Sequence, residues 1–185
     1  MDVNKFYNQY YQKIFDSCIS IKDSDFKSIL EIILSSQKSN NKLIFVGNGG
    51  SASIASHLTI DSTNAASLRA VNFNDPGMIT CLSNDYGYEN WISKALDFYA
   101  DEGDVLILIS SSGQSKNMLM AVNKARKLKM KILTLTGFLS NNPLRGKGDV
   151  NLWVNSNEYN IVEMTHHIWL LSIIDYLIIN MELFK

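Results

Sequence analysis

The stretch LIFVGNGGS, residues 43–51, leads four apolar residues directly into a loop that contains three glycines. An apolar run followed by glycines is typical of a buried strand that ends in a tight turn. A second apolar run, VLILI at 105–109, leads in the same way into SSSGQS at 110–115. Helical patterns follow both loops, so each stretch predicts a strand, a loop and a helix in that order.

The same alternation continues through most of the chain. Apolar, β-rich runs occur at 42–46, 105–109, 131–136 and 149–154, with a weaker one at 68–73. Helical patterns separate them at 52–63, 89–100, 115–129 and 159–183, and a short helix is expected to begin at Pro76. Strands that alternate with helices indicate an α/β fold, with a parallel sheet covered by helices on both faces.

Two further helices are expected before the first strand, at residues 2–20 and 24–37, with Asp23 or Ser24 as the cap of the second. We interpret residues 1–185 as a single domain and residues 1–40 as its N-terminal helical extension. The first helix is rich in aromatic residues, which could bury against the domain or form an interface. Both alternatives remain open from the sequence.

Composition excludes several classes of protein. Seventeen basic and eighteen acidic residues give a formal charge of −1, with no basic run of the kind that binds nucleic acid. The first residues lack the continuous apolar core of a secretory signal, which predicts a cytoplasmic protein. The most apolar stretch, 168–179, is interrupted by Ser172 and Asp175 and is predicted to be a buried helix that does not span a membrane.

The two loops offer chemistry suited to a phosphate. Backbone N–H groups and clustered hydroxyls at the start of a helix bind a compact anion, because the helix end carries partial positive charge. The second loop supplies Ser110, Ser111, Ser112 and Ser115, and the first supplies Ser51. A single serine would more simply cap a helix or form a turn. The cluster as a whole predicts a phosphorylated small molecule as the ligand.

Two pairs of titratable residues have helical spacing. His57 and Asp61 are four residues apart on the helix after the first loop, and Glu163 and His167 are four apart on the last helix. A spacing of four places both members on one helical face, where they could bind a divalent metal or transfer protons. A simple hydrogen bond on the helix surface is the alternative.

These loops, with their order and spacing, resemble the sugar isomerase (SIS) domain family and, within it, the phosphoheptose isomerase branch. Three other segments support the resemblance: NDYGYE at 84–89, GDV at 103–105 leading into ISSSG at 109–113, and LTG at 135–137. The resemblance implies a flavodoxin-like α/β sandwich. It also implies a homotetramer with active sites between subunits, which converts sedoheptulose 7-phosphate to a heptose 7-phosphate.

The resemblance also implies site residues. The positions that would contact the sugar phosphate are Asn48, Gly49, Gly50, Ser51, Asn84, Asp85, Ser110, Ser111, Ser112 and Ser115. His57 matches a histidine of the branch, and Asp61 stands where the branch has its catalytic glutamate.

The last helix departs from the branch. Val162 stands where the branch has a glutamine that can ligate zinc, and Leu170 where it has its catalytic histidine. His166 lies four residues from each and shares their stripe of the helix. We therefore expect Asp61 as the base and His166 as its partner, with Glu163 and His167 as secondary candidates. No cofactor is required by this scheme, and a divalent metal such as zinc at His57 and Asp61 remains an alternative.

The sequence thus predicts an isomerase that acts on a phosphorylated sugar through an enediol. A base removes the proton from the carbon beside the carbonyl, and an acid transfers protons to and from the oxygens as the enediol forms. The competing hypothesis is a non-catalytic SIS protein that senses phosphosugars or binds other proteins. A non-catalytic SIS protein would also be expected to lack the branch's glutamine and histidine.

Overall fold

The computed structural model describes residues 2–180. Its strands are β1 (Leu43–Gly47), β2 (Ala70–Asn72), β3 (Val105–Ser110), β4 (Lys131–Thr136) and β5 (Val150–Trp153). Its helices are α1 (Val3–Cys18), α2 (Asp23–Lys38), α3 (Gly50–Asn64), α4 (Pro76–Tyr86), α5 (Trp91–Tyr99), α6 (Lys116–Lys127) and α7 (Tyr159–Ile179). Each element predicted from the sequence is present, with its ends shifted by a few residues.

The strands form one parallel sheet in the order β2-β1-β3-β4-β5. Leu43 of β1 lies opposite Val105 of β3, and Val105 lies opposite Lys131 of β4. This is the flavodoxin-like strand order, in which the direction of winding reverses between β1 and β3. The predicted α/β class is therefore confirmed. Ligands of such sheets bind outside the carboxyl ends of the strands at this reversal.

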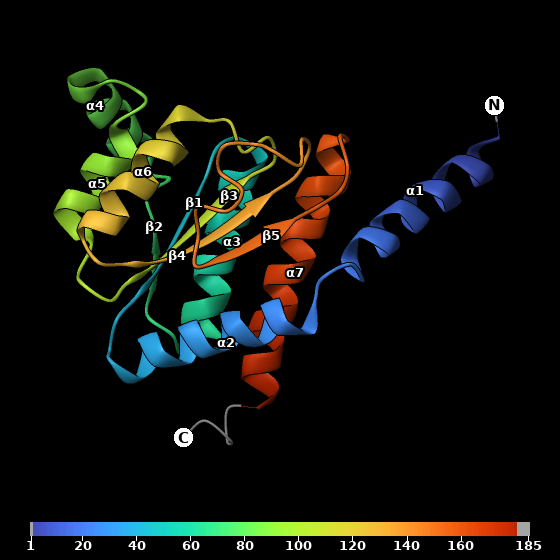
Figure 1. The fold of residues 1–185 in the computed structure, drawn as a ribbon, viewed down its shortest axis with the longest axis horizontal. Helices are drawn as coiled ribbons and strands as arrows, with labels where there is room; N and C mark the ends of the chain where they lie inside the picture. Colours follow the sequence, from blue (N-terminus) through green and yellow to red (C-terminus); the bar gives the residue numbers. More distant parts are fainter. Residues whose placement is uncertain (1, 181–185) are drawn as a thin grey trace.

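Helices cover both faces of the sheet, as Figure 1 shows. On one face Phe45 and Ile107 pack in a core with residues of α2, α3 and α7. On the other face Ile44 and Leu106 pack with residues of α4, α5 and α6. Successive strand residues point to opposite faces, so a strand covered on both sides is apolar at every position. That explains the unbroken apolar runs in the sequence.

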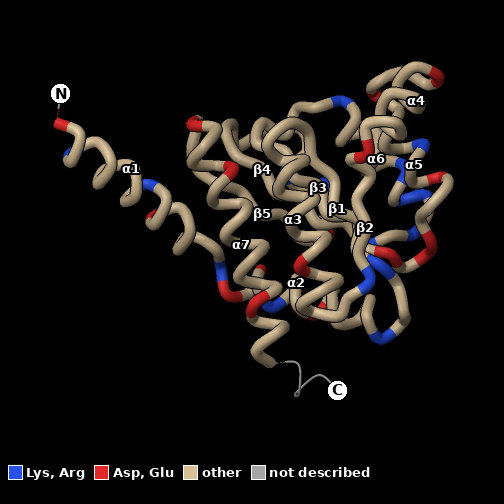
Figure 2. The backbone as a smooth tube through the Cα atoms, turned by 180° about the vertical axis from the view of Figure 1, so that it is seen from behind, with Lys and Arg blue, Asp and Glu red and all other residues tan. Residues whose placement is uncertain are grey.

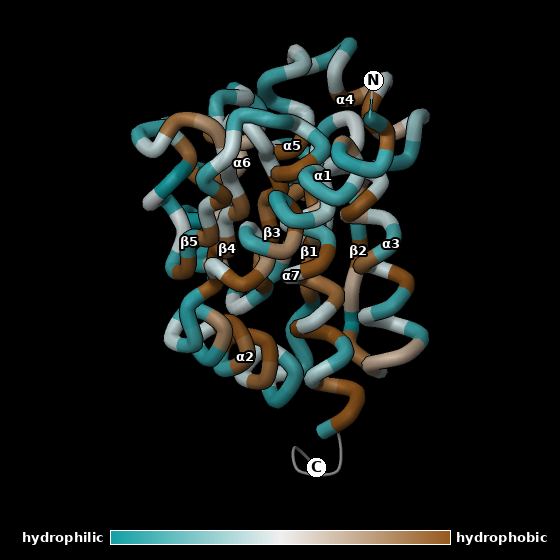
Figure 3. The backbone as a smooth tube through the Cα atoms, turned by 90° about the vertical axis from the view of Figure 1, so that its right-hand side faces the viewer, coloured by the Kyte–Doolittle hydropathy of each residue, from teal (hydrophilic) through white to brown (hydrophobic). Residues whose placement is uncertain are grey.

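The surface charge is mixed. Lys, Arg, Asp and Glu are interspersed over α5 and α6 without a stripe of one sign (Figure 2). Hydrophobic residues concentrate along the central strands (Figure 3).

The first helix, α1, projects from the body of the domain (Figure 1), and none of its residues is buried. Its attachment includes a hydrogen bond from Nε1 of Trp169 to the carbonyl oxygen of Cys18, at 2.8 Å, and an ion pair between Lys13 and Glu158. The next helix begins at Asp23 with Lys22 as its N-cap, and no side chain caps it. The expected cap by Asp23 or Ser24 is wrong, because the helix starts one residue earlier than predicted.

The last helix, α7, is longer than its most apolar stretch. Its 21 described residues are enough, by length and composition alone, to span a membrane. Half of the residues in the apolar 18-residue segment of this helix are buried inside the protein, as in a core helix. The buried positions recur at helical spacing and pack on the sheet, and the described helix is therefore accounted for by the core. Residues 181–183 of the predicted helix lie outside the described residues.

Candidate active site

The glycine loop, residues 47–51, connects β1 to α3. Gly47 ends β1 in a position where a Cβ would collide with the backbone of Ser51, so only glycine fits there. Gly49 is the N-cap of α3 and has φ of +55°, in the left-handed region that favours glycine. The loop therefore turns tightly and presents the N-terminus of α3 at the carboxyl edge of the sheet. A helix of fifteen residues starts there with its positive end toward the edge.

The serine loop, residues 110–115, connects β3 to α6. Ser110 and Ser111 are buried, and the Ser111 hydroxyl has no hydrogen-bond partner among the described residues. Ser115 is the N-cap of α6, yet its side chain makes no capping hydrogen bond. Two hydroxyls of the loop are thus without a protein partner at the start of a helix. A buried hydroxyl without a partner costs free energy, and a bound anion would supply that partner.

An asparagine pair joins the two loops. Nδ2 of Asn48 donates to Oδ1 of Asn117 at 3.1 Å, and Nδ2 of Asn117 donates back to Oδ1 of Asn48 at 2.9 Å. The hydroxyl of Tyr88 also donates to Oδ1 of Asn48, at 3.2 Å. The two loops therefore form one site at the reversal point of the sheet. Asn117 was missed by the sequence analysis, because its burial and its contact with Asn48 are visible only in the structure.

Asn84 and Asp85 lie at the end of α4 and are exposed. Nδ2 of Asn84 donates to Oδ1 of Asp85 at 3.0 Å, and the thiol of Cys81 donates to the other carboxylate oxygen. Among the described residues, the contact that this region makes with the glycine loop comes from Tyr88 instead. The role of Asn84 and Asp85 in binding sugar phosphate stays a prediction.

Three titratable side chains meet between α3 and α7. Nδ1 of His57 lies 2.9 Å from Nε2 of His167, and Nε2 of His57 lies 3.2 Å from Oδ2 of Asp61. The two imidazole rings are nearly perpendicular. Partial burial lowers the pKa of His167, the neighbouring His57 lowers it further, and Asp61 opposes both effects. The predicted proximity of His57 and Asp61 is confirmed, and His167 joins them.

His166 lies on a different stripe of α7. Its side chain is fully buried, and Nε2 lies 3.1 Å from the carbonyl oxygen of Thr136 at the end of β4. Burial lowers the pKa of His166 to about 4, against the opposing effect of the bond to Thr136. The predicted pairing of His166 with Asp61 is not found in the described structure. The geometry corrects it, because Val162, His166 and Leu170 face the sheet, whereas the adjacent stripe faces α3.

Glu163 lies at the glycine loop. A Cβ at Gly50 would be 2.5 Å from Oε2 of Glu163, so the carboxylate occupies the space that this glycine leaves open. The residue is partly exposed, and within residues 2–180 its carboxylate has no hydrogen-bond or ion-pair partner. Burial raises the pKa of Glu163. A carboxylate of raised pKa beside a candidate substrate-binding loop is typical of an acid–base catalyst.

The residues present do not fit a zinc site of the expected kind. Val162 and Leu170, at the two positions where the resembling branch has a glutamine and a histidine, are apolar and buried. His57 presents a different ring nitrogen to each neighbour, so the observed contacts do not converge on one ion. Among residues 2–180 no group of three His, Cys, Asp or Glu side chains has the geometry to hold a metal. Zinc normally needs three or four such ligands.

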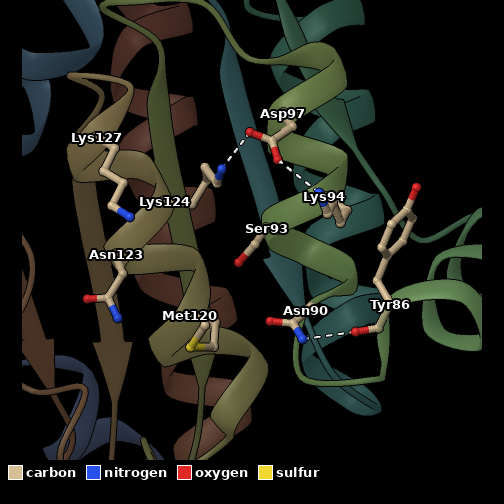
Figure 4. Close-up of a pocket in the computed structure, with 9 residues that line it drawn as sticks. All are labelled: Tyr86, Asn90, Ser93, Lys94, Asp97, Met120, Asn123, Lys124 and Lys127. Atoms are coloured by element: carbon tan, nitrogen blue, oxygen red, sulfur yellow. Dashed lines mark hydrogen bonds and ion pairs between the residues drawn. The ribbon is translucent and has the colours of Figure 1, made fainter.

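A groove between α5 and α6 is separate from both loops (Figure 4). It contains Lys124 and Lys94, which both pair with the carboxylate of Asp97. The groove also contains Ser93 and Lys127, but no residue of the glycine or serine loop. Because Lys94 and Lys124 are paired with Asp97 and neither loop lines the groove, we do not assign it to the candidate site.

Comparison with known proteins agrees with this geometry. The model of the SIS domain family matches residues 6–137. A phosphoheptose isomerase from Cytophaga hutchinsonii is 37% identical over 121 residues, which are 63% of this chain and 63% of that protein. One from Edwardsiella ictaluri is 36% identical over 129 residues, 67% of this chain and 66% of that protein. The chain thus covers less than two thirds of the length of these relatives.

Solved structures match over a larger part of the chain. A phosphoheptose isomerase from Francisella tularensis superposes with a TM-score of 0.85 at 26% identity, covering 96% of this chain and 98% of that one. One from Neisseria gonorrhoeae gives a TM-score of 0.84 at 27% identity, with 94% and 97% covered. The family model, the flavodoxin-like sheet and the two loops at its reversal point lead to one conclusion: this chain belongs to the SIS domain family.

Proposed function

We propose that this protein is an aldose–ketose isomerase of phosphorylated sugars, which interconverts sedoheptulose 7-phosphate and D-glycero-D-manno-heptose 7-phosphate through an enediol. The observation that carries the proposal is the serine loop, in which the Ser111 hydroxyl has no hydrogen-bond partner among the described residues. The Asn48–Asn117 pair links the helix that follows this loop to the glycine loop. The names of the relatives support the same reaction. The substrate is a phosphosugar, and the site is built to hold its anion.

The phosphate is assigned to the serine loop. Glu163 lies against Gly50, and a carboxylate repels a phosphate dianion at short range. The serine loop has no acidic residue and offers hydroxyls at the N-terminus of α6. The reactive, uncharged end of the sugar then lies toward the glycine loop. Asn84 and Asp85 complete the sugar contacts from the exposed end of α4.

The enzyme acts without a bound metal. Among residues 2–180, the side chains between α3 and α7 form no group that could hold zinc, and enediol chemistry needs only a base and a proton shuttle. Treatment with a strong chelator should leave the exchange rate unchanged. Loss of activity that returns with zinc would contradict this part of the proposal.

A cytoplasmic location also stays a prediction.

The protein assembles as a homotetramer, with neighbouring subunits closing its active sites. Support comes from α1, where Val3, Tyr7, Tyr11 and Phe15 form an exposed stripe four residues apart. A projecting helix with an apolar face needs a partner surface, because an isolated helix of this length is only marginally stable in water. A second copy of the chain supplies that surface.

Incubation with sedoheptulose 7-phosphate in deuterated water tests the function. An isomerase introduces deuterium at the carbon beside the carbonyl even when net turnover is slow, and NMR detects it. Shorter ketose phosphates, tested in parallel, define the accepted chain length. If the protein binds these compounds by calorimetry and exchanges none of them, it is a phosphosugar sensor and the isomerase proposal fails.

A further inference from the structure

The stripe of α7 that faces α3 contains two groups suited to proton transfer. Glu163 and His167 are one helical turn apart, about 6 Å along the axis, and both are partly exposed. We propose that Glu163 and His167 are the acid–base pair of this protein, and that Asp61 positions His167 through His57. This inference rests on the proposed isomerase function and assigns its roles to residues.

The contacts among Asp61, His57 and His167 determine which ring nitrogen of each histidine carries the hydrogen. Ionised Asp61 can only accept, so Nε2 of His57 donates to it. Nδ1 of a neutral His57 is then an acceptor, and it takes the hydrogen of His167 Nε2. His167 is left with a free lone pair on Nδ1. Asp61 therefore acts as the aspartate of a catalytic triad does, by setting the tautomer of the histidine that it contacts.

Glu163 is better placed than Asp61 to be the base. Asp61 is already paired with His57, at 3.2 Å from its Nε2. The carboxylate of Glu163 lies against Gly50 and has no hydrogen-bond or ion-pair partner among the described residues. A sugar held by the serine loop can therefore bring its carbonyl end to Glu163 within one chain.

The proton transfers balance with these two groups. In the ketose-to-aldose direction, the Glu163 carboxylate takes the proton of the hydroxymethyl carbon, and that C–H electron pair becomes the C=C bond of an enediolate. The carbonyl electron pair moves onto its oxygen. Nδ1 of His167 takes the neighbouring hydroxyl proton and gives it to this oxygen. Protonated Glu163 then protonates the former carbonyl carbon, which leaves an aldehyde with no net gain or loss of protons.

Four single variants test the assignment. Glu163→Gln and His167→Gln should each slow deuterium exchange into sedoheptulose 7-phosphate by about 100-fold or more, the usual effect of losing an acid–base group. Calorimetric binding of the sugar phosphate should persist. Glu158→Gln is the matched control, because Glu158 is exposed and pairs with Lys13 just before the first turn of α7. It should leave the exchange rate unchanged.

Asp61→Ala, the fourth, tests the positioning role with a readout independent of activity. In the wild type, ¹⁵N NMR should find His57 and His167 as neutral imidazoles protonated at Nε2. The variant should populate both tautomers of His57 and lose at least about tenfold in exchange rate. If His57 keeps its wild-type tautomer in Asp61→Ala, the positioning role of Asp61 is overturned.

The outcomes separate this inference from the function on which it rests. If the wild type exchanges and either Glu163→Gln or His167→Gln exchanges at the same rate, the assignment is overturned and the isomerase remains. If the wild type exchanges no ketose phosphate, the isomerase proposal falls and the assigned roles fall with it. Loss of exchange in both variants, with binding and the Glu158→Gln control intact, supports the inference.

Discussion

Nε2 of His167 lies 2.9 Å from Nδ1 of His57, and this contact joins α7 to α3. One residue earlier, His166 points into the sheet and contacts Thr136. Adjacent residues on a helix project about 100° apart, so neighbouring histidines can have unrelated surroundings. His167 is partly exposed and available for proton transfer, whereas His166 is part of the buried core.

Removing two hydroxyls from the serine loop should weaken phosphate binding. Ser111→Ala combined with Ser115→Ala deletes two donors, and the affinity for the sugar phosphate should fall by about 2 kcal/mol at about 1 kcal/mol per hydrogen bond. Isothermal calorimetry measures the change. Ser24→Ala, on the exposed surface of α2, is the control. Equal affinities of the double variant and the wild type for the sugar phosphate would show that this loop does not bind the phosphate.

Gly50→Ala should separate activity from stability. The new Cβ meets the carboxylate of Glu163, which is the flexible end of its side chain and can move away. The free energy of unfolding should therefore change by less than about 1 kcal/mol. A displacement of about 1 Å at a catalytic group costs on the order of 100-fold in rate, so deuterium exchange should slow strongly. Full exchange in this variant would show that the position of Glu163 is unimportant.

Acid should destabilise the fold through His166. Its folded-state pKa, about 4, is below the value of 6.5 for an unperturbed histidine, so the unfolded chain binds a proton first as the pH falls. This contribution to stability is complete above pH 6.5 and is lost between pH 6.5 and pH 4. It amounts to about 3 kcal/mol at about 1.4 kcal/mol per unit of pKa.

Urea unfolding of the wild type and His166→Gln at pH 7.5, 6 and 5 measures this contribution. Glutamine can still donate to the Thr136 carbonyl, but it does not titrate. The stability advantage of the wild type should shrink as the pH falls. A constant difference across this range would show that His166 titrates normally in the folded protein.

Polar substitutions on α1 should change the oligomeric state. Tyr7→Ser, Tyr11→Ser and Phe15→Ser together remove most of its exposed apolar stripe. Light scattering of the wild type at micromolar concentration should give the mass of a tetramer, and the triple variant should give a smaller mass. Because none of these side chains is buried within the chain, the unfolding temperature of the separated subunit should be retained. A monomeric wild type would refute the assembly.

Much of the fold and half of the site follow from local patterns. The apolar runs at 43–46 and 105–109 have no polar interruption, which requires strands covered on both faces. The glycine and serine loops were predicted because each motif is contiguous and needs only its own strand and helix. Asn117 was missed because its role depends on Asn48, which is 69 residues away.

The orientation of α7 could be decided only by tertiary structure. The sequence determines that α7 is a helix and that residues at a spacing of four share a stripe. It does not determine which stripe faces the sheet, because both Val162–His166–Leu170 and Glu163–His167 are compatible with an apolar helix that contains histidine. Packing decides this: the first stripe is buried against β4 and the second meets α3. The physical reason is that helical periodicity is a local property, whereas the rotation of a helix about its axis is fixed by the surfaces on which it packs.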